Sequence, residues 1–408
     1  MHLYLPSNFF FPELPGGSLQ YLRYAPYLRD RGIKITVLTT LRPEHKGEKI
    51  EAEGLEIRRI PGVGDGNFLE DLLMLADFAA REIASRGLRR QACIQPIGTF
   101  AFTPRSVAKL ARIRLAGIPL FRHFTEVPEI KQAGILRMTR RRLVERVGLS
   151  PYNRLLMCSH TMGRTFQELA GIGAKRIAVI PNGIDRKIFH PIDPTFKSGT
   201  RTRLGLPDSG PIVLSVCSVI PRKGVDLLIK AWQTVLDRCP SASLVIVGSN
   251  HVRSTFDEPG VRDRLEEYLK NVQELVSNLS NPKSVIFTGE VSNVEDYYQA
   301  SDLFVFASHK EGLPSAVLEA MSSGLPSVLA PFHGFPDPGE EYGTPGSEFL
   351  AVSHDPASIA SALIHLLGSP EARTRLGASA SMWIESTQSI EKAADRLARV
   401  YHSAHGGC

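Results

Sequence analysis

Residues 302–330 read DLFVFASHKEGLPSAVLEAMSSGLPSVLA, and they join an apolar run to a well-marked helix start. The run 302–307 predicts a buried strand. Pro314 fits the first helical position, good helix formers follow over 315–323, and Gly324 fits the C-cap. The apolar segment that closes the stretch predicts a second strand. A strand, a helix and another strand in this order indicate parallel strands of an α/β fold.

Two glutamates bracket the start of this predicted helix. Glu311 stands just before the helix, and Glu319 lies about one turn inside it. Unpaired N–H groups and the positive end of the helix dipole lie between them and can bind an anion. A carboxylate only accepts hydrogen bonds, so it suits paired sugar hydroxyls. The pattern therefore predicts a sugar nucleotide, with Glu311 on the sugar and Glu319 on the ribose, although two solvated glutamates would look the same.

Strands and helices alternate along both halves of the chain, which predicts parallel sheets covered on both faces. Residues 181–210 are rich in Pro, Gly and polar residues and mark a domain boundary. We predict two doubly wound, Rossmann-like domains, 1–190 and 205–385, that face each other across a cleft, with a terminal helix at 390–404 that packs back on the first domain. Strands are expected at 2–6, 33–39, 55–60, 91–95, 118–122, 154–158, 176–180, 212–219, 243–247, 285–288, 302–307, 326–330 and 348–352, and further helices at 18–31, 68–85 and 225–236.

Composition describes a soluble globular protein of two domains: the 408 residues are 43% hydrophobic and 22% charged. A net charge of +6 suits anionic ligands or an anionic membrane surface and is not diagnostic of nucleic acid. The first 17 residues lack the pattern of a secretory signal, and no apolar run reaches the length of about 18 residues needed to span a membrane. We therefore expect a cytosolic protein. The cysteines form no CxxC pair, which argues against a disulfide framework or a zinc site; they are Cys93, Cys158, Cys217, Cys239 and Cys408.

Two loops that follow first strands carry candidate ligand-binding groups. Gly16 and Gly17 follow the first strand, and their backbone could approach a phosphate closely, although a simple turn is the alternative. Arg222 and Lys223, in SVIPRKG (218–224), are predicted to open a helix in the second half. Cations there could neutralise a departing diphosphate. The alternative is two solvated basic residues, but positive charge at a helix start is unfavourable next to the positive end of the helix dipole, so their position needs another reason. The chain contains no GxGxxG after the first strand and no GxxxxGK[ST] loop.

Several of these motifs together resemble one known family. The segment EGLPSAVLE (311–319) resembles its EGxxxxxxE signature, and PRKGVDLL (221–228), PNGID (181–185) and YQASD (298–302) fit beside it. The chain is similar to retaining glycosyltransferases of the GT-B fold, family four, which includes many mannosyl- and glucosyltransferases. The resemblance covers nearly the whole chain; it is specific in the second half and mainly one of layout in the first, where acceptors bind.

The resemblance implies roles for individual residues. Glu311 would contact the transferred sugar, Glu319 the ribose and Lys223 the diphosphate, with Gly17 near it. His123 follows a strand of the first half, where relatives often have an acceptor-side His, although a lone His is often structural. The implied catalytic residues are Glu311, Lys223 and Arg222, the donor-binding ones Gly17, Lys223, Glu311, Gly312, Leu313, Pro314, Ser315 and Glu319, and the acceptor-binding ones Gly16, Arg122 and His123, with Glu126 equally placed.

The chain departs from the family at two places. Ser218 stands where relatives usually have an Arg five positions before the Lys, and Arg222 is the candidate to supply that charge. Asp337 stands where relatives usually carry a Glu. The resemblance implies catalysis without a cofactor or metal, and the chain has no Asp-x-Asp pair to hold one. It also implies a UDP-sugar or GDP-mannose co-substrate and attack by the acceptor on the same face that the leaving group departs from.

The acceptor and other partners stay open at the level of sequence. A sugar, a lipid-linked sugar or a small molecule would serve as acceptor, and no nucleic acid is expected. The basic run 137–146, RMTRRRLVER, is a solvated helix face or a contact with an anionic membrane. Alternatives to a transferase are a GT-B epimerase and, because of Ser218, a non-catalytic binder of nucleotide sugars. A phosphorylase of similar fold would need a pyridoxal-phosphate lysine in a much longer chain.

Overall fold

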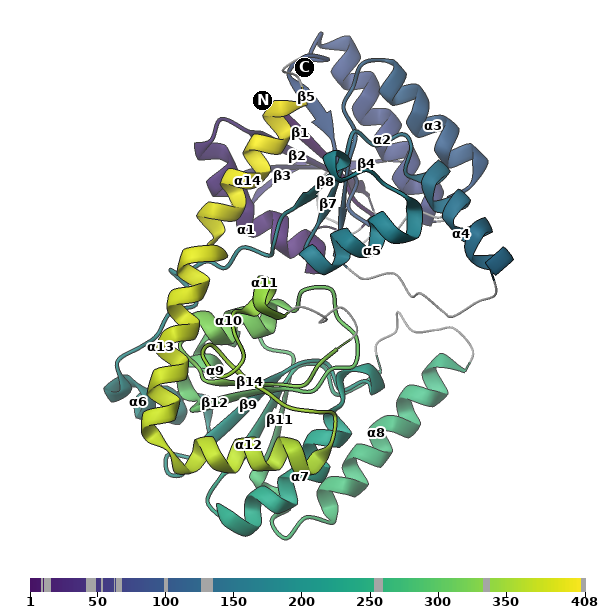
Figure 1. Cartoon of the computed structure of the whole chain (residues 1–408). Helices are drawn as coiled ribbons and strands as arrows, with labels where there is room; N and C mark the ends of the chain where they lie inside the picture. Colours follow the sequence, from purple (N-terminus) through teal and green to yellow (C-terminus); the bar gives the residue numbers. More distant parts are fainter. Residues whose placement is uncertain are drawn as a thin grey trace. The chain divides into compact units, whose positions relative to one another are not determined.

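The computed structural model divides the chain into two compact units, one of Met1–Gly183 with Ile390–Cys408 and one of Ile184–Ser389 (Figure 1). Each unit is described by itself. The residues described are 1–8, 10, 16–41, 49–52, 54–61, 63, 68–98, 102–125, 135–252, 260–332 and 338–404. Among the helices in these ranges, none combines the length and the apolar character that a bilayer span requires.

The first unit is built on a sheet with the strand order β3-β4-β2-β1-β5. β1 pairs in parallel with both β2 and β5, so the chain leaves β1 towards one side of the sheet and later returns on the other. A parallel bridge between Ile94 and Leu120 continues this sheet towards the strands β6-β7-β8. The strands are β1 (His2–Pro6), β2 (Lys34–Thr40), β3 (Lys49–Ala52), β4 (Leu55–Ile60), β5 (Ala92–Ile94), β6 (Phe121–Phe124), β7 (Arg154–Met157) and β8 (Ile177–Val179).

Helices cover this sheet, and the last helix of the chain belongs to them. α14 packs on α1, and Leu397 and Tyr401 of α14 are buried in the same hydrophobic core as Leu3 and Tyr24 (Figure 1). Arg31 also pairs with Asp395 at 2.6 Å. The helices are α1 (Gly16–Asp30), α2 (Phe68–Ser85), α3 (Pro104–Leu115), α4 (Ile135–Gly148), α5 (His160–Ala170) and α14 (Ile390–Ser403).

The second unit has a sheet in which neighbouring strands run parallel in the order β11-β10-β9-β12-β13-β14. Numbered within the unit this is 3-2-1-4-5-6, the order of a Rossmann sheet, whose ligands bind where the order reverses. That point lies between β9 and β12. The strands are β9 (Ile212–Val216), β10 (Ser243–Val247), β11 (Val285–Gly289), β12 (Leu303–Phe306), β13 (Ser327–Leu329) and β14 (Leu350–Ala351).

Amphipathic helices cover the second sheet. α7 buries Val225, Leu228, Ile229, Trp232 and Val235, which lie three or four residues apart on one face, and it packs on α12. α10 packs on α13. The helices are α6 (Lys197–Leu204), α7 (Val225–Arg238), α8 (Val261–Ser277), α9 (Val294–Ala300), α10 (Ser315–Ser322), α11 (Pro338–Tyr342), α12 (Pro356–Gly368) and α13 (Pro370–Thr387).

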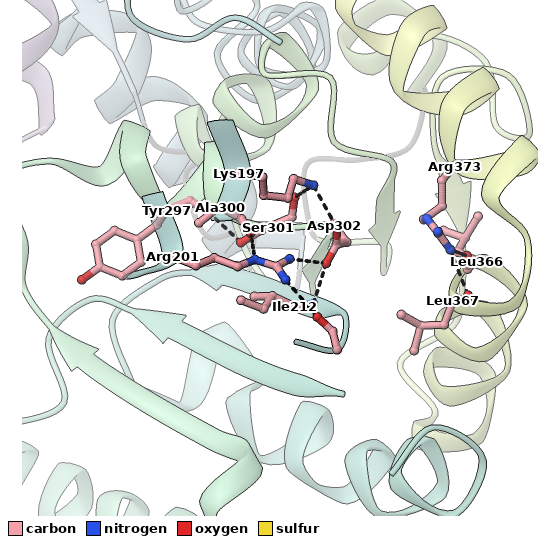
Figure 2. Close-up of polar contacts among 11 residues, drawn as sticks. Lys197, Arg201, Ile212, Tyr297, Ala300, Ser301, Asp302, Leu366, Leu367 and Arg373 are labelled. Atoms are coloured by element: carbon pink, nitrogen blue, oxygen red, sulfur yellow. Dashed lines mark hydrogen bonds and ion pairs between the residues drawn. The ribbon is translucent and has the colours of Figure 1, made fainter. Parts of the chain in front are cut away.

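A charged cluster fixes the beginning of the second unit to its sheet (Figure 2). Asp302, at the start of β12, accepts from Lys197 Nζ at 2.9 Å, from Arg201 Nη2 at 2.7 Å and from Ile212 N at 2.7 Å. Arg201 also donates to Ala300 O and Gly210 O. These contacts tie α6 to β9 and β12 at the end of the sheet remote from the strands' carboxyl ends. In the same view, Arg373 donates to two carbonyls of the last turn of α12, Leu366 O and Leu367 O.

This cluster explains a difference from the predicted boundary. The sequence predicts a first domain that ends at 190 and a second that begins at 205, whereas the units divide after Gly183. Residues 184–204 lie with the second unit because α6, which the sequence analysis does not predict, carries Lys197 and Arg201. The predicted parallel sheet is present in the first unit, with one antiparallel pair added at its edge, where β3 runs antiparallel to β4.

Smaller differences concern the ends of elements. Pro314 is the N-cap of α10 rather than its first residue, and Ser315 begins the helix. Arg222 and Lys223 lie in a 3-10 turn, Pro221–Lys223, ahead of α7 instead of opening that helix. Gly16 and Gly17 belong to the first turn of α1, not to the loop before it. Strands β9 and β12–β14 start later or end earlier than predicted, because apolar runs continue past the last ladder hydrogen bond. β6 is shifted along the chain, to 121–124 instead of the predicted 118–122.

Candidate functional site

Two loops meet at the carboxyl ends of β9 and β12, where the strand order of the second sheet reverses. Arg222 O accepts hydrogen bonds from His309 N at 2.7 Å and from Ser308 Oγ at 2.9 Å. Gly224 has a φ of +66°, and a Cβ built there would lie 2.2 Å from Ala307 O. The close approach of the loops therefore depends on glycine at 224.

Glu311 is the centre of this meeting point. Its Oε1 lies 2.5 Å from Lys223 Nζ, 3.2 Å from Arg222 Nη1 and 2.6 Å from Ser308 Oγ. The side chains of Glu311 and Lys223 are 10% and 14% exposed, whereas that of Arg222 is 47% exposed. Lys223 Nζ also lies 5.5 Å from the centre of the Phe306 ring. The acid and the two cations predicted from the sequence thus form one cluster.

Glu311 Oε2 takes part in none of these contacts. Within the described part of the chain it has no hydrogen bond, while Oε1 receives both cations and the Ser308 hydroxyl. One carboxylate oxygen is therefore held in place and the other is available to accept from a ligand's hydroxyl.

The start of α10 follows directly after Glu311. Gly312, Leu313 and Pro314 lead into the helix, which begins at Ser315, and the positive end of its dipole lies at this first turn. Glu319 is buried one turn later, and its Oε2 lies 3.1 Å from the Tyr298 hydroxyl of α9. The helix start can hold a phosphate group, and Glu319 is fixed on the same short helix.

Two histidines that the sequence analysis does not single out support this loop. His354 Nε2 lies 3.1 Å from Ser308 O, so this nitrogen carries the proton and donates to the carbonyl. The rings of His309 and His354 stack with centroids 4.4 Å apart. Burial and the neighbouring His354 lower the pKa of His309. No motif marks these residues, because only the fold brings the segment after β14 against the loop after β12.

The predicted acceptor-side residues lie in the first unit. Gly16 and Gly17 follow β1, beside the point where the order of the first sheet reverses. Arg122 is buried, and its Cζ lies 4.8 Å from the Phe124 ring and 5.4 Å from the Phe102 ring. Glu126 and Asp337 lie outside the described residues. Arg122 therefore packs among aromatic rings inside the first unit, and these contacts give it a structural role there.

His123 takes part in a buried polar network. Its Nδ1 lies 3.1 Å from the Tyr21 hydroxyl, which also accepts from Gln95 Nε2 and lies 3.2 Å from the Tyr401 hydroxyl. Burial lowers the pKa of His123 to about 4, so its ring is neutral at pH 7. Its Nε2 is buried without a hydrogen-bond partner among the described residues. The network ties α14 to the first unit through Tyr401.

Elsewhere in the described residues we looked for a metal site and for a cavity that includes the residues around Glu311. No cluster of three or more His, Cys, Asp and Glu side chains in these ranges is arranged to hold a metal ion. A cavity of about 520 Å³ beside the 3-10 turn does not include Glu311 or Lys223. It is lined by Pro221, Arg264, Glu267, Tyr268, Lys270, Asn271 and Glu274.

The architecture is the GT-B fold, which consists of two Rossmann-like domains. A glycosyltransferase from Rickettsia africae matches with a TM-score of 0.77 and 15% identity over 100% of this chain and 99% of that one. Anabaena HepE, in complex with UDP and glucose, matches with a TM-score of 0.71 and 18% identity over 98% and 99%. These likenesses concern the fold.

Sequence comparison gives the family. Residues 197–383 match the family "Glycosyl transferases group 1", and residues 16–183 match "Glycosyl transferase 4-like domain". The chain therefore contains a group 1 glycosyltransferase domain at 197–383 and a glycosyltransferase 4-like domain at 16–183. It is 25% identical to a D-inositol 3-phosphate glycosyltransferase of Kineococcus radiotolerans, over 90% of this chain and 85% of that protein. It is also 29% identical to a GDP-mannose-dependent mannosyltransferase of monoacylated phosphatidylinositol monomannoside from Corynebacterium glutamicum, over 55% of each chain, so it spans about half of that relative.

Proposed function

We propose that this protein transfers a sugar from a nucleotide-diphosphate sugar to an acceptor hydroxyl, with retention of anomeric configuration and without a bound metal. The observation that carries the proposal is the convergence of Lys223, Arg222 and Glu311 at the point where the Rossmann sheet reverses its order. A phosphate group binds cations, whereas sugar hydroxyls bind hydrogen-bond acceptors. This cluster contains both kinds of partner within one site.

Donor binding rearranges the cluster in this proposal. The diphosphate lies at the start of α10 and draws Lys223 and Arg222 towards its oxygens. Glu311 then exchanges its ion pairs for hydrogen bonds from hydroxyls of the transferred sugar. Glu319, anchored by Tyr298, accepts from the ribose. GDP-mannose and UDP-sugars are the donors to test first, because a relative's name specifies GDP-mannose and the HepE structure contains UDP.

The chemistry follows from the charge distribution. The bond between the anomeric carbon and the diphosphate oxygen breaks, and charge develops on the leaving group. Lys223, Arg222 and the N-terminus of α10 stabilise that charge in the place of a metal. The acceptor hydroxyl attacks from the same face, forms the new glycosidic bond and gives its proton to the departing phosphate oxygen, so no protein nucleophile is required.

The acceptor contacts the first unit in this proposal. His123 Nε2 is a neutral, buried atom without a partner among the described residues, and an acceptor hydroxyl would satisfy it. Gly16, at the start of α1, is the second acceptor-binding residue of this proposal. Relatives named for inositol phosphate and for a phosphatidylinositol mannoside make phosphorylated polyols and lipid-linked sugars the acceptors to screen, as in glycoconjugate synthesis.

A donor screen followed by a transfer assay tests the proposal. Each nucleotide sugar is added to the full chain and the thermal midpoint measured, since a ligand at a hundred times its Kd stabilises by about 2.7 kcal/mol. The stabilising donor is then incubated with acceptors, with and without EDTA. An α-linked product from an α-linked donor, formed equally with EDTA, is the expected result, and an inverted product or dependence on a divalent cation would overturn the mechanism.

The same experiment separates the alternative functions. An epimerase would convert the nucleotide sugar to its epimer when no acceptor is present, and NMR of the donor alone detects this. A non-catalytic binder would show donor stabilisation without product for every acceptor class. Either result would replace the transferase proposal.

A further inference from the structure

Helix α4 of the first unit presents apolar side chains to solvent. Leu143, Val144 and Val147 are 62%, 45% and 49% exposed. With Arg140 they occupy positions i, i+3, i+4 and i+7, which share one face of an α-helix. The C-terminal end of α4 packs inward, where Gly148 lies against the Phe102 ring and the next residue, Leu149, is buried. A surface helix normally turns its apolar residues to the core, so this exposed apolar face indicates a surface that binds another molecule.

Arginines accompany the apolar face: Arg140 lies on it, Arg146 lies beside it, and Arg142 lies on the opposite side of the helix. Arg140, Arg142 and Arg146 are exposed. Within the described ranges none of them forms an ion pair, in contrast to Arg105 of α3, which pairs with Glu70 at 2.8 Å. The surface therefore combines aliphatic side chains with cations that form no ion pair in the described ranges, although the partly buried Glu145 lies on the same helix.

The end of α3 extends this surface. Arg114 Nη1 donates to Ser150 O at 2.6 Å, which places the C-terminal end of α3 beside the C-terminal end of α4. The next residue, Leu115, is 86% exposed, and Arg112 is exposed as well. α3 has no acidic residue, so cations again accompany the apolar side chain.

We propose that α4 and the end of α3 dock the protein on a bilayer that contains anionic lipid. Arg140 on the face and Arg146 beside it would bind phosphates of the headgroups, and Leu143, Val144, Val147 and Leu115 would enter the acyl boundary. The face contains aliphatic side chains and no aromatic residue. A protein interface would favour Tyr, Trp and Phe, and nucleic acid would require the cations without the exposed leucines. Docking is a property of the first unit and is independent of the donor site.

Flotation of the full chain with vesicles tests the inference. Vesicles of phosphatidylcholine alone and with 30 mol % phosphatidylglycerol (about a third anionic lipid) are compared at low and at physiological salt. We expect binding to the anionic vesicles that weakens as salt rises. Leu143→Ser with Val147→Ser should lower the partition coefficient about tenfold while the salt dependence stays. Arg140→Ser with Arg146→Ser should lower binding and also flatten its salt dependence.

Matched variants in the second unit serve as controls. Phe196→Ser with Met382→Ser removes exposed apolar side chains, and Arg262→Ser with Arg264→Ser removes two exposed charges; both should bind as the unmodified chain does. Thermal midpoints of all variants check the fold. Failure of the unmodified chain to float with anionic vesicles would overturn the inference, as would equal losses in test and control pairs. Dimerisation through Leu143 and Val147 without vesicle binding would assign the face to a second copy and also overturn it.

Discussion

Lys223 Nζ lies 2.5 Å from Glu311 Oε1, although the two residues are 88 positions apart in the chain. The pair joins the loop after β9 to the loop after β12, and both side chains are largely shielded from water. In the proposed function these two groups separate when the donor binds, because the diphosphate takes Lys223 and the sugar takes Glu311. The ion pair thus keeps each group positioned for a ligand that replaces it.

Removal of the Glu311 carboxylate should separate binding from turnover. In Glu311→Gln and Glu311→Ala we expect kcat to fall by about a hundredfold or more, since hydrogen bonds to the reacting sugar are lost. Binding of the free nucleoside diphosphate should stay equal or become tighter, because the carboxylate no longer competes for Lys223. Calorimetry and initial rates measure the two effects, with Glu266→Gln on the exposed face of α8 as the control. Unchanged turnover would refute the assigned site.

The two cations should differ in their contribution. Lys223→Ala should weaken nucleoside diphosphate binding about 10- to 100-fold, because its charge acts in a shielded position. Arg222→Ala should weaken it less than about tenfold, since exposed charges are screened. Nucleoside diphosphate is titrated into each variant at two salt concentrations. The affinity lost in Arg222→Ala should depend on salt more strongly than the affinity lost in Lys223→Ala, and Lys270→Ala is the control. The ranking fails if Arg222→Ala proves the more damaging change.

Gly224 should be required for the approach of the two loops. Gly224→Ala places a side chain at positive φ, which costs about 1–2 kcal/mol, and sets Cβ against Ala307 O. Gly205→Ala pays the same backbone cost at φ +65° with nothing within 4 Å of the new Cβ. Both variants should lose thermal stability, but only Gly224→Ala should also lower kcat/KM, by about tenfold or more. Equal activity in the two variants would contradict this assignment.

His354 should act on catalysis through the position of Glu311. It donates to Ser308 O, and the Ser308 hydroxyl contacts Glu311 Oε1. His354→Ala should lower kcat by about tenfold with little change in nucleotide affinity. His354→Gln, which retains an N–H donor, should recover part of the activity. His365→Ala, on the exposed side of α12, should have no effect, and a loss of stability without the kcat effect would leave His354 a purely structural residue.

Asp302 should make the stability of the second unit depend on pH. Burial alone would raise the pKa of Asp302, but Lys197, the Ile212 N–H and Arg201 outweigh it and hold the pKa below its ordinary value. The unfolded chain therefore binds the proton more readily, so the stabilisation is complete above about pH 4 and is lost as pH falls through the lower, folded value. Asp302→Asn should reduce the free energy of unfolding by about 2 kcal/mol at pH 7. The difference between the two proteins should shrink at acid pH, and a constant difference from pH 7 to pH 2 would contradict the argument.

Much of the local structure could be predicted from periodicity and caps. The bounds of β1, β4, β10 and α2 agree with the predictions, because apolar runs or helical spacing coincide there with clear breaks. β3 was missed because KIEA is short and half polar. α6 was missed because KSGTRTRL has no apolar face, and its Lys197 and Arg201 bind Asp302 instead of packing in a core.

The sequence by itself determined the chemistry of the site: which residues carry the charges and that a helix begins directly after Glu311. Only the tertiary structure decided that Lys223 and Arg222 meet Glu311, that Ser308 and His354 hold the loop, and that α4 turns leucine and valine outward. The reason is physical. The hydrophobic pattern of a strand determines which of its faces is buried, but it does not specify which strands lie beside it. The adjacency of β9 and β12 arises from the packing of the whole sheet.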